Sequence, residues 1–473
     1  MIFSSFEYFI LFTIFTFFYY LTSSRITKNY LILFGSFFFI AFTHYKHLLI
    51  LLIFLFIFLL TIHLFNKKKL SNFNTSIILI SLIFLIFKYY SIIKFENFSL
   101  LNKTFYMFLP IGISFYTFQI IGALVDVKFQ ADKKFYKNKL LDLSVFVCFF
   151  PQLIAGPICR VKNILFQLSQ RRSFNNHNFS IGTFLIFLGL LKKVLISDQL
   201  YIYTYEIWQN PQNFNSETIW IALFAYYIQI YADFSGYTDI GRGCARILGL
   251  KIPINFTNPY FACSPGEFFN RWHISLSSWI RDYIFNPLNI YFLRKFPKFV
   301  NHFIIINLFI VMFLFGVWHG NTFKIIFYGI ILGIMVSFWH IMRLNNFENK
   351  YKNIFGFIWT QGFFIFSLIF LNTKNLDNTF LFLKSLISSK NNNYVDILNI
   401  TLFYYFLIVF LQVICMRSLI FKNRNYLKIL FNKYSPYIYI TLIIFIYVLK
   451  GYFFGPYGIP FDHEEIAFTY FQF

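Results

Sequence analysis

The chain alternates long apolar runs with short polar interludes. A helix that crosses a bilayer needs about 20 mostly apolar residues, and the strongest runs approach this length: Ile2–Thr22, His47–Phe65, Thr75–Ile93, Ser180–Ile196, Phe303–Trp318, Ile325–Met342, Ile354–Leu371, Thr401–Met416 and Ile438–Phe454. Weaker candidates for spans are Asn29–Ala41, Thr104–Val125, Leu140–Pro157 and Thr218–Tyr237. The pattern predicts an all-α integral membrane protein with about 11–13 spanning or re-entrant helices.

The most polar interlude, Asn372–Asp396, keeps apolar residues at a roughly helical spacing, at Leu376, Phe380, Leu383 and Ile387. This spacing predicts an amphipathic helix that lies at the membrane surface and ends near Asn391–Asn393. No Gly/Ser-rich linker or soluble segment interrupts the chain. We therefore expect a single integral domain over residues 1–473, with generic spans in 1–100 and the chemistry in 101–473.

Composition supports the membrane prediction. A soluble domain is about half apolar and a quarter charged, whereas this chain is 58% hydrophobic and 12% charged, with a mean hydropathy of +0.62. Phe (74) and Tyr (33) are abundant. A ligand channel is one explanation, but lipid-facing Phe and interfacial Tyr are the simpler one.

The formal charge of +23 could indicate nucleic-acid binding. However, the basic residues stand in short loops between apolar runs, as at Lys67–Lys69, Lys133–Lys137 and Arg171–Arg172. The positive-inside rule and anionic headgroups produce this pattern. We therefore expect a lipid bilayer as the partner of these charges, and no nucleic acid.

Loop charge also predicts an orientation. Placing Arg25 and Lys28 on the cytoplasmic side puts the N-terminus outside. A full crossing by Leu140–Pro157 would then carry Arg160–Arg172 to the outer face, against the rule. A hairpin that turns back through Pro151–Pro157 removes the conflict, because Pro and Gly allow a re-entrant turn buried in protein.

Several kinds of site are not supported by the residues. The cysteines lack CxxC spacing, so neither a disulfide framework nor a zinc site is predicted; they are Cys148, Cys159, Cys244, Cys263 and Cys415. Gly241–Gly243 lacks the third glycine of a dinucleotide fingerprint, and no Gly-x-Ser-x-Gly elbow occurs. We expect no bound metal and no tightly bound cofactor.

The scarce ionisable residues crowd into Gln229–Gly320: Asp233, Asp239, Arg242, Arg246, Glu267, Arg271, His273, Arg281, Asp282 and His319. At membrane depth such groups are costly, and they usually face an interior cavity and serve function. The alternative is that most of this stretch is a cytoplasmic or interfacial loop, where charge costs little. The sequence leaves both open.

Two histidines stand out from this stretch. His319 ends the apolar run before it, and His273 lies between Trp272 and Ile274. A lone histidine is more often structural than catalytic, but two Trp-His pairs favour a site. A neutral imidazole is a fitting general base, since it can take a proton from a hydroxyl that attacks an acyl thioester. A second histidine or Arg271 could orient it or stabilise the oxyanion.

The motifs resemble those of the membrane-bound O-acyltransferases, in particular the bacterial branch of the alginate O-acetylase membrane protein. The resemblance extends from about residue 100 to the C-terminus, through Leu109–Gln119, Phe150–Pro157, Leu190–Lys193, Asp233–Asp239, Asn255–Tyr260, Arg271–Ser277, Trp279–Tyr283, Trp318–Gly320 and Tyr470–Phe473. It implies a funnel-like helix bundle with a buried catalytic histidine.

The resemblance assigns that role to His319, with His273 as the second site residue. The residues expected to bind substrate or shape the site are Arg271, Trp272, Trp318, Asp233, Ser235, Tyr237, Asp239 and Asp282. Three departures from the family leave the acceptor and the partner surface open. They are Asn289-Ile290 for two glycines, no Tyr-His-Gly at Ile330–Gly333, and Phe370–Thr373 for a Phe-Phe-Arg-Ala segment.

Three functions follow as hypotheses. The first is transfer of acetyl from a cytoplasmic thioester such as acetyl-CoA to an envelope polysaccharide, either peptidoglycan or an exopolysaccharide. It implies a location in the bacterial plasma (inner) membrane and an extracytoplasmic acetyltransferase partner. The second is D-alanyl transfer to teichoic acid. The third is a non-enzymatic transporter of polysaccharide or lipid-linked sugar, which would need polar residues spread along broken helices.

Overall fold

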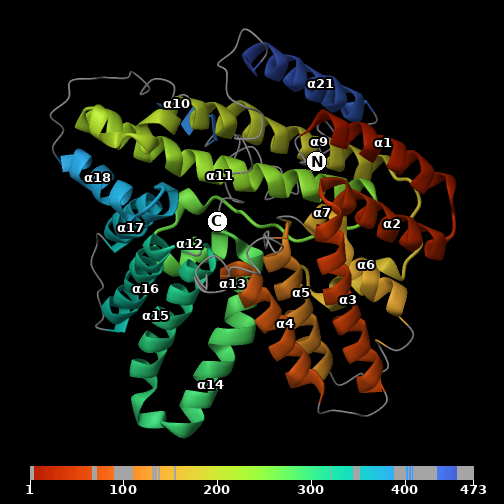
Figure 1. Cartoon of the computed structure of the whole chain (residues 1–473), viewed down its shortest axis with the longest axis horizontal. Helices are drawn as coiled ribbons and strands as arrows, with labels where there is room; N and C mark the ends of the chain where they lie inside the picture. The colour runs from red at the N-terminus through yellow and green to blue at the C-terminus, as the bar shows by residue number, and fades with distance from the viewer. Residues whose placement is uncertain are drawn as a thin grey trace, which may run out of the picture. The chain divides into compact units, whose positions relative to one another are not determined.

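The computed structural model describes residues 5–66, 72–89, 110–129, 136, 139–153, 156–320, 322–344, 352–387, 401–402, 404–405, 407–408 and 434–454 (Figure 1). Every regular element within these ranges is helical, which confirms the all-α prediction. Some predicted features lie wholly or largely outside them: the span Thr401–Met416, the end at Asn391–Asn393, the basic loops Lys67–Lys69 and Lys133–Lys137, and the closing Tyr470–Phe473.

Two compact units share the chain. Unit 1 comprises Met1–Gly189, Tyr237–Ile254 and Leu430–Ile443, and unit 2 comprises Leu190–Gly236, Asn255–Ile429 and Ile444–Phe473. Each unit draws on segments that are far apart in the sequence. Neither is therefore a separable piece of chain, and the single integral domain stays a prediction.

Unit 1 begins with α1 (Phe6–Leu21), α2 (Arg25–Thr43), α3 (Tyr45–Asn66), α4 (Asn72–Tyr89) and α5 (Ile113–Phe129). Serine hydroxyls cap the first two helices, since Ser5 accepts from the Tyr8 amide and Ser24 from the Thr27 amide. Helices α3, α4 and α5 lie side by side (Figure 1). Large apolar side chains such as Phe17, Phe34 and Phe56 are exposed, as lipid-facing positions require.

The segment after α5 brings its two ends together, as the predicted hairpin requires, and its re-entry into the membrane stays a prediction. It contains α6 (Leu140–Cys148), α7 (Phe150–Leu153) and α8 (Val161–Leu168), each too short to cross a bilayer. The amide of Asn29 donates to the Asp142 carboxylate at 2.7 Å and to the Leu168 carbonyl at 3.4 Å. Both ends of the segment therefore meet the same residue of α2.

The depth of this hairpin can be measured along α2. The Phe150 amide donates to the Ser36 hydroxyl at 3.2 Å, seven residues beyond Asn29, which is about 10 Å along a helix. The Gln152 side chain donates to the Phe146 carbonyl at 2.8 Å, and the Gln119 side chain donates to it as well. These bonds satisfy backbone that the broken helix leaves unpaired.

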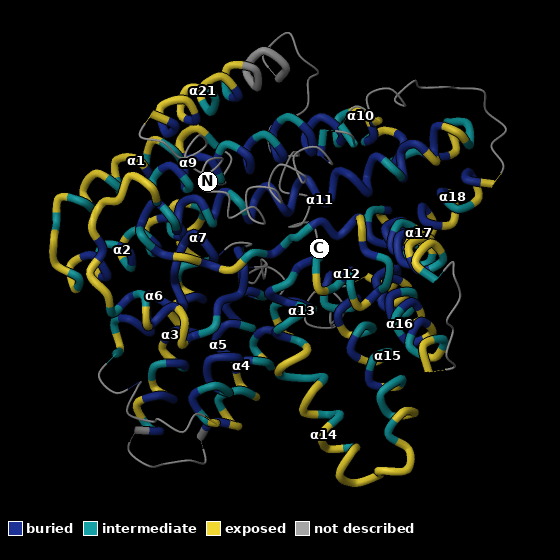
Figure 2. Tube along the Cα trace, turned by 180° about the vertical axis from the view of Figure 1, so that it is seen from behind, coloured by how far each residue is buried: buried dark blue, intermediate teal, exposed yellow. Residues whose placement is uncertain are grey.

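A continuous helical stretch, Asn176–Gln209, follows as α9 (Asn176–Leu190), a π-helix (Leu191–Ser197) and α10 (Asp198–Gln209). Helix α11 (Ser216–Ile247) is largely buried, as Figure 2 shows. Its first part belongs to unit 2 and its last part to unit 1.

The remaining helices of unit 2 are α12 (Pro265–Arg271), α13 (Ile274–Ile280), α14 (Asn286–Lys295), α15 (Val300–Trp318), α16 (Phe323–Leu344), α17 (Lys352–Asn372) and α18 (Leu376–Ile387). A π-helix, Arg281–Phe285, joins α13 to α14. Helices α15, α16 and α17 pack in sequence order, and α14 runs back along α15 (Figure 1). Helix α21 (Ser435–Phe454) is divided between the units.

Within the described residues, helices long and apolar enough to cross a membrane are Arg25–Thr43, Tyr45–Phe65, Asn176–Gln209, Pro297–Trp318, Phe323–Leu344 and Lys352–Asn372. Shorter apolar helices are Phe6–Leu21, Phe73–Tyr89 and Ser435–Val448. Asn29–Ala41, a weak candidate in the sequence, is therefore among the strong ones, because α2 extends it at both ends.

The amphipathic helix predicted within Asn372–Asp396 is α18. Phe382 is buried and stacks on Trp208 with ring centroids 4.2 Å apart, whereas Phe380 and Ile387 are exposed. The apolar stripe read from the sequence is thus the outward one, and the helix has a second, buried face. Contact of the outward stripe with the membrane surface stays a prediction.

Candidate active site

His319 stands at the C-terminal end of α15 and is only 6% exposed. Its Nδ1 lies 2.8 Å from the Phe315 carbonyl oxygen, one turn back along the helix. The last carbonyls of a helix have no amide partner within it, and a carbonyl can only accept. Nδ1 must therefore carry the proton, and the neutral ring keeps its lone pair on Nε2.

Aromatic rings enclose His319. Its ring centroid lies 4.9 Å from Phe315, 4.7 Å from Trp318 and 5.4 Å from Tyr328 of α16, and each of these rings meets it edge-on. Tyr328 is almost fully buried. These walls limit access of water to the imidazole and fix its orientation.

A close approach of α15 and α16 brings Tyr328 to the histidine. A Cβ added at Gly316 would lie 2.2 Å from the Gly329 Cα, and one added at Gly329 would lie 2.6 Å from the Phe313 carbonyl oxygen. Only glycine permits this distance between backbones. Gly316 is three residues before His319 and Gly329 directly follows Tyr328, so the contact sets the geometry of the pair.

His273 is completely buried and has a left-handed backbone, with φ 45° and ψ 50°. This conformation is uncommon outside glycine and occurs where surrounding structure enforces it. Here Asn255 enforces it, because its carbonyl accepts from the Ile274 amide and its side-chain oxygen accepts from the Ser275 amide, both at 3.0 Å. The ring is thereby aimed inward at the start of α13.

The His273 ring contacts Phe234 of α11 edge-on, with centroids 4.7 Å apart, and lies 6.3 Å from Trp318. Because Trp318 also contacts His319, one indole links the two histidines. Burial lowers the pKa of His273 well below its ordinary value of about 6.5, and the nearby His319 lowers it further. His273 is therefore uncharged near neutral pH.

A buried ion cluster lies beside the Phe234 position. The Lys193 ammonium is 2.8 Å from the Asp198 carboxylate and 2.8 Å from that of Asp233, and all three side chains are at most 6% exposed. Lys193 projects from the π-helix Leu191–Ser197, a distortion frequent at functional sites. Since Phe234 follows Asp233 on α11, the cluster anchors the turn that contacts His273.

The other predicted site residues lie at different distances from the two histidines. Trp318 lies between the histidines, and Ser235 is buried on α11. Trp272 is buried against Phe268 and Phe364, with centroids 5.6 Å and 5.1 Å away.

Charged members of that set make local ion pairs. Arg271 lies 2.5 Å from Glu267, Asp239 lies 2.7 Å from Arg242, and the 43%-exposed Asp282 lies 3.5 Å from Arg281. Asp239 and the buried Tyr237 belong to unit 1, whereas both histidines belong to unit 2. The roles of all these residues in binding or shaping the site stay predictions.

Four residues of this arrangement were missed as site residues. Lys193 and Asp198 could have been recognised in the sequence, since charges within an otherwise apolar run must find partners. Phe234 and Tyr328 could not have been recognised there, because an aromatic residue in a chain with 74 Phe and 33 Tyr is not distinctive. Among the described residues, no three His, Cys, Asp or Glu side chains group in a way that could hold a metal ion.

Comparisons with known proteins identify the family of the chain. Residues 123–374 match the family profile described as MBOAT, membrane-bound O-acyltransferase family. The chain is 36% identical over 251 residues to the probable alginate O-acetylase AlgI of Pseudomonas putida, which covers 53% of this chain and 49% of that protein. The match thus spans about half the length of this relative.

Two further relatives differ in coverage. The chain is 30% identical over 397 residues to the peptidoglycan O-acetyltransferase of Helicobacter pylori, covering 76% of this chain and 73% of that protein. It is 28% identical over 278 residues to the teichoic acid D-alanyltransferase of Bacillus subtilis, covering 54% of this chain and 68% of that protein.

Proposed function

This chain belongs to the membrane-bound O-acyltransferase family, and from that premise we propose that it moves acetyl from a cytoplasmic thioester towards a cell-envelope polysaccharide. One observation carries the proposal: His319 is a buried imidazole whose Nδ1 is committed to the Phe315 carbonyl, which leaves Nε2 as the basic nitrogen. Membership of a transferase family also decides against the non-enzymatic transporter.

The proposed reaction follows from this tautomer. Nε2 of His319 takes the proton of an acceptor hydroxyl as its oxygen attacks the thioester carbonyl. The tetrahedral intermediate then expels the sulfur, which takes the proton back from the imidazolium. An oxygen ester and a free thiol result, and the histidine is regenerated. General-base catalysis of this kind contributes about 10²–10⁴-fold to a rate.

His273 fits a supporting role in this reaction. Because burial keeps its pKa low, it stays neutral while His319 becomes charged in the intermediate. A second positive charge at this position would oppose that protonation. A neutral imidazole can also donate a hydrogen bond to the developing oxyanion. We therefore propose His319 as the base and His273 as the second site residue.

The acceptor is a proposal drawn from the relatives. The match to the peptidoglycan O-acetyltransferase covers a larger share of both chains than the match to the alginate O-acetylase, which favours peptidoglycan as the acceptor. The alginate O-acetylases make an exopolysaccharide the next choice. Transfer of D-alanine to teichoic acid is the alternative, supported by a relative with lower identity. Acetyl-CoA as donor, an extracytoplasmic acetyltransferase as partner and the bacterial inner membrane as location complete the proposal.

The test measures ester-linked acetate on envelope glycans in a deletion strain that carries wild type, His319→Ala or His273→Ala. We expect His319→Ala to lower acetylation by about 10²–10⁴-fold, and His273→Ala to cause a large but smaller loss. His302→Ala is the matched control, because His302 lies on the same helix and is exposed near its start.

Two results would change the conclusion. Full acetylation with His319→Ala, at protein levels equal to wild type, would remove His319 as the catalytic base. Loss of D-alanine esters rather than acetate esters in the deletion strain would make the alternative substrate the correct one.

A further inference from the structure

The Asn255 side chain, which holds the turn of His273, has a buried amide nitrogen with no partner. Asn255 is 1% exposed, and its Nδ2 makes no hydrogen bond within the part of the chain that the structure describes. A buried polar group that stays unpaired costs free energy. Each such group therefore calls for an explanation, and a catalytic role is one of them.

The orientation of this amide follows from the partner of its other end. The side-chain oxygen of Asn255 accepts from the Ser275 backbone amide at 3.0 Å. A backbone N–H can only donate, so the atom that faces it must be the oxygen, and the remaining branch must be the NH₂ group. The oxygen is thus committed to the backbone, while two N–H donors stay available.

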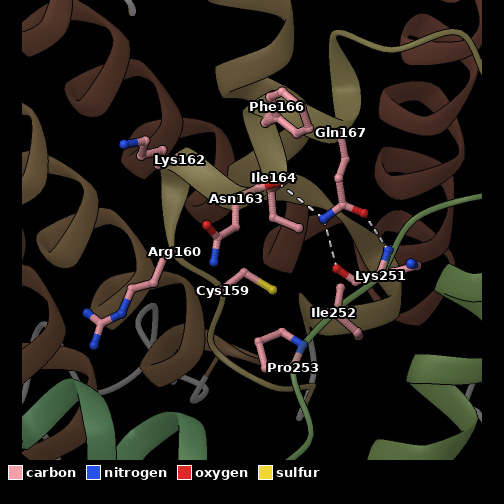
Figure 3. Close-up of a pocket in the computed structure, with 10 residues that line it drawn as sticks. All are labelled: Cys159, Arg160, Lys162, Asn163, Ile164, Phe166, Gln167, Lys251, Ile252 and Pro253. Carbon is pink, nitrogen blue, oxygen red and sulfur yellow. Dashed lines mark hydrogen bonds between the residues drawn. The ribbon is translucent and has the colours of Figure 1, made fainter. Parts of the chain in front are cut away.

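Other side-chain amides that clamp backbone segments use both ends. In the pocket of Figure 3, Gln167 accepts from the Lys251 amide at 2.7 Å through its oxygen and donates to two carbonyls through its nitrogen. Likewise, Gln361 accepts from the Tyr227 hydroxyl at 2.7 Å and donates to two carbonyls. Asn255 makes only the accepting half of such a clamp, so its nitrogen is not explained by the clamp.

Two backbone hydrogen bonds hold Asn255 beside the turn of His273. The Ile274 amide donates to the Asn255 carbonyl, and the Thr257 amide donates to the Arg271 carbonyl, both at 3.0 Å. These bonds lie on either side of His273 in the sequence, so the segment that starts at Asn255 runs along the turn. All of these residues belong to unit 2. The position of the asparagine relative to the histidine is therefore fixed.

Aromatic contacts connect this segment to both histidines. The ring of Phe256 lies 5.1 Å from that of Phe234, and Phe234 meets His273 at 4.7 Å. Trp318 then links His273 to His319. The segment thus belongs to the packed group that forms the candidate active site, and it brings to this group a donor that does not titrate.

We propose that Nδ2 of Asn255 donates a hydrogen bond to the carbonyl oxygen of the acyl thioester as that oxygen becomes an oxyanion. This inference rests on the proposed acetyl transfer. When the acceptor oxygen adds to the thioester carbon, one C=O electron pair moves to the carbonyl oxygen, which then accepts from the amide. The pair returns to the C=O bond as the C–S bond breaks. A fixed, uncharged donor is the kind of group that stabilises such an oxyanion.

Acetyl-CoA and its dithioacetyl analogue, in which sulfur replaces the carbonyl oxygen, test this inference. Membranes of the deletion strain carry wild type, Asn255→Leu or Asn255→Asp, and release of the coenzyme A thiol gives kcat and KM. Asn255→Leu removes both ends of the amide without adding charge, whereas Asn255→Asp, assayed at about pH 8 so that the carboxylate is ionised, keeps an oxygen for the Ser275 amide.

Asn270→Asp is the matched control. It makes the same change from amide to carboxylate at an exposed position three residues before His273, and it keeps the oxygen that accepts from Arg281. This variant should therefore release thiol from both donors at the rate of wild type.

We expect both Asn255 variants to lower kcat with acetyl-CoA by about 10²–10³-fold, which is typical for the loss of one oxyanion donor. KM should change by less than about twofold, because the lost bond forms in the transition state. With the dithioacetyl analogue the loss should be at least about tenfold smaller, since sulfur is a weak acceptor.

An equal loss with both donors would overturn the inference, because Asn255 would then act only by holding the turn. Rates equal to wild type in Asn255→Leu would also overturn it. The same assay with His319→Ala separates the two proposals. If His319→Ala releases thiol as wild type does, the proposed reaction fails. If it does not, and Asn255 affects both donors equally, only the role of Asn255 fails.

Discussion

At the residue scale, local hydrogen bonds fix each histidine of the site. The Phe315 carbonyl selects the tautomer of His319, and the two bonds from Asn255 hold His273 in its left-handed conformation. Burial keeps His273 uncharged at neutral pH, and the Phe315 carbonyl directs the free lone pair of a neutral His319 to Nε2.

The burial of His273 predicts a pH dependence of stability. The folded state holds this residue unprotonated, whereas the unfolded chain binds a proton below about pH 6.5. Its folded pKa is depressed, so its contribution to stability is fully present above about pH 6.5 and is lost as the pH falls below that value. One group lowers the free energy of unfolding by at most about 1.4 kcal/mol per pH unit.

His273→Asn checks this prediction, because asparagine accepts the left-handed conformation and does not titrate. The free energy of unfolding in detergent is measured from about pH 8 to about pH 5. The difference between wild type and variant should change with pH below about 6.5. A difference that stays constant over the range would contradict the neutral, buried state of His273.

At the scale of elements, the α15–α16 contact determines where His319 meets Tyr328. Gly316→Ala places a Cβ 2.2 Å from the Gly329 Cα, so the two helices must separate. We expect a loss of about 1–3 kcal/mol in stability. A displacement of His319 by about 1 Å should lower acetyl transfer by about 10²-fold.

Gly362→Ala is the matched control, since a Cβ there meets nothing within 4 Å. A helical Gly→Ala change without a clash is neutral or stabilises by up to about 1 kcal/mol. Thermal unfolding and acetyl-ester formation are measured for both variants. Equal behaviour of the two would show that the close backbone contact is unimportant for the site.

The Lys193 cluster gives a second prediction at this scale. Lys193→Met leaves the buried carboxylates of Asp198 and Asp233 together without a cation. Asp233→Asn leaves a Lys193–Asp198 pair. Removing one partner of a buried ion pair costs about 3–5 kcal/mol, so Lys193→Met should be the more destabilised variant by a wide margin.

Thermal unfolding in detergent ranks the two variants. Lys193→Arg serves as control, because it keeps the positive charge and should recover part of the loss. If Asp233→Asn is destabilised as strongly as Lys193→Met, Lys193 does not neutralise both carboxylates as we infer.

At the scale of the whole molecule, the hairpin of α6–α8 affects the membrane topology. Lys139, before α6, and the exposed Arg171, after α8, lie at the two ends of a segment that turns back on α2. Cysteines at these positions should therefore react with an impermeant maleimide from the same side of the membrane. The side predicted from loop charge is the cytoplasmic one.

Intact cells and inside-out vesicles carrying Lys139→Cys or Arg171→Cys provide the measurement, with the unsubstituted chain as background. Labelling of the two positions from opposite faces would exclude a re-entrant hairpin. Arg171 is chosen rather than its neighbour Arg172, whose buried guanidinium bonds Tyr19 and the Leu168 carbonyl.

Much of the architecture could be predicted from local pattern. Apolar runs of spanning length identify the helices, and the positive-inside rule predicts a hairpin in the segment whose two ends both contact Asn29. The exposed apolar stripe of α18 also follows from the helical spacing of apolar residues in the sequence. Its buried face was not, because Phe382 packs on Trp208, and no local period reveals a partner so distant in the chain.

The amino-acid order alone predicts a helical, membrane-embedded chain, and the Trp-His context and motifs mark His319 and His273 as candidate site residues. Hydrocarbon sets helix length and polarity residue by residue, so those properties are local. The contacts of Trp318 with both rings, of Tyr328 with His319 and of Lys193 with two aspartates come from the fold. Such pairings depend on helix packing, which brings together residues that no local pattern relates.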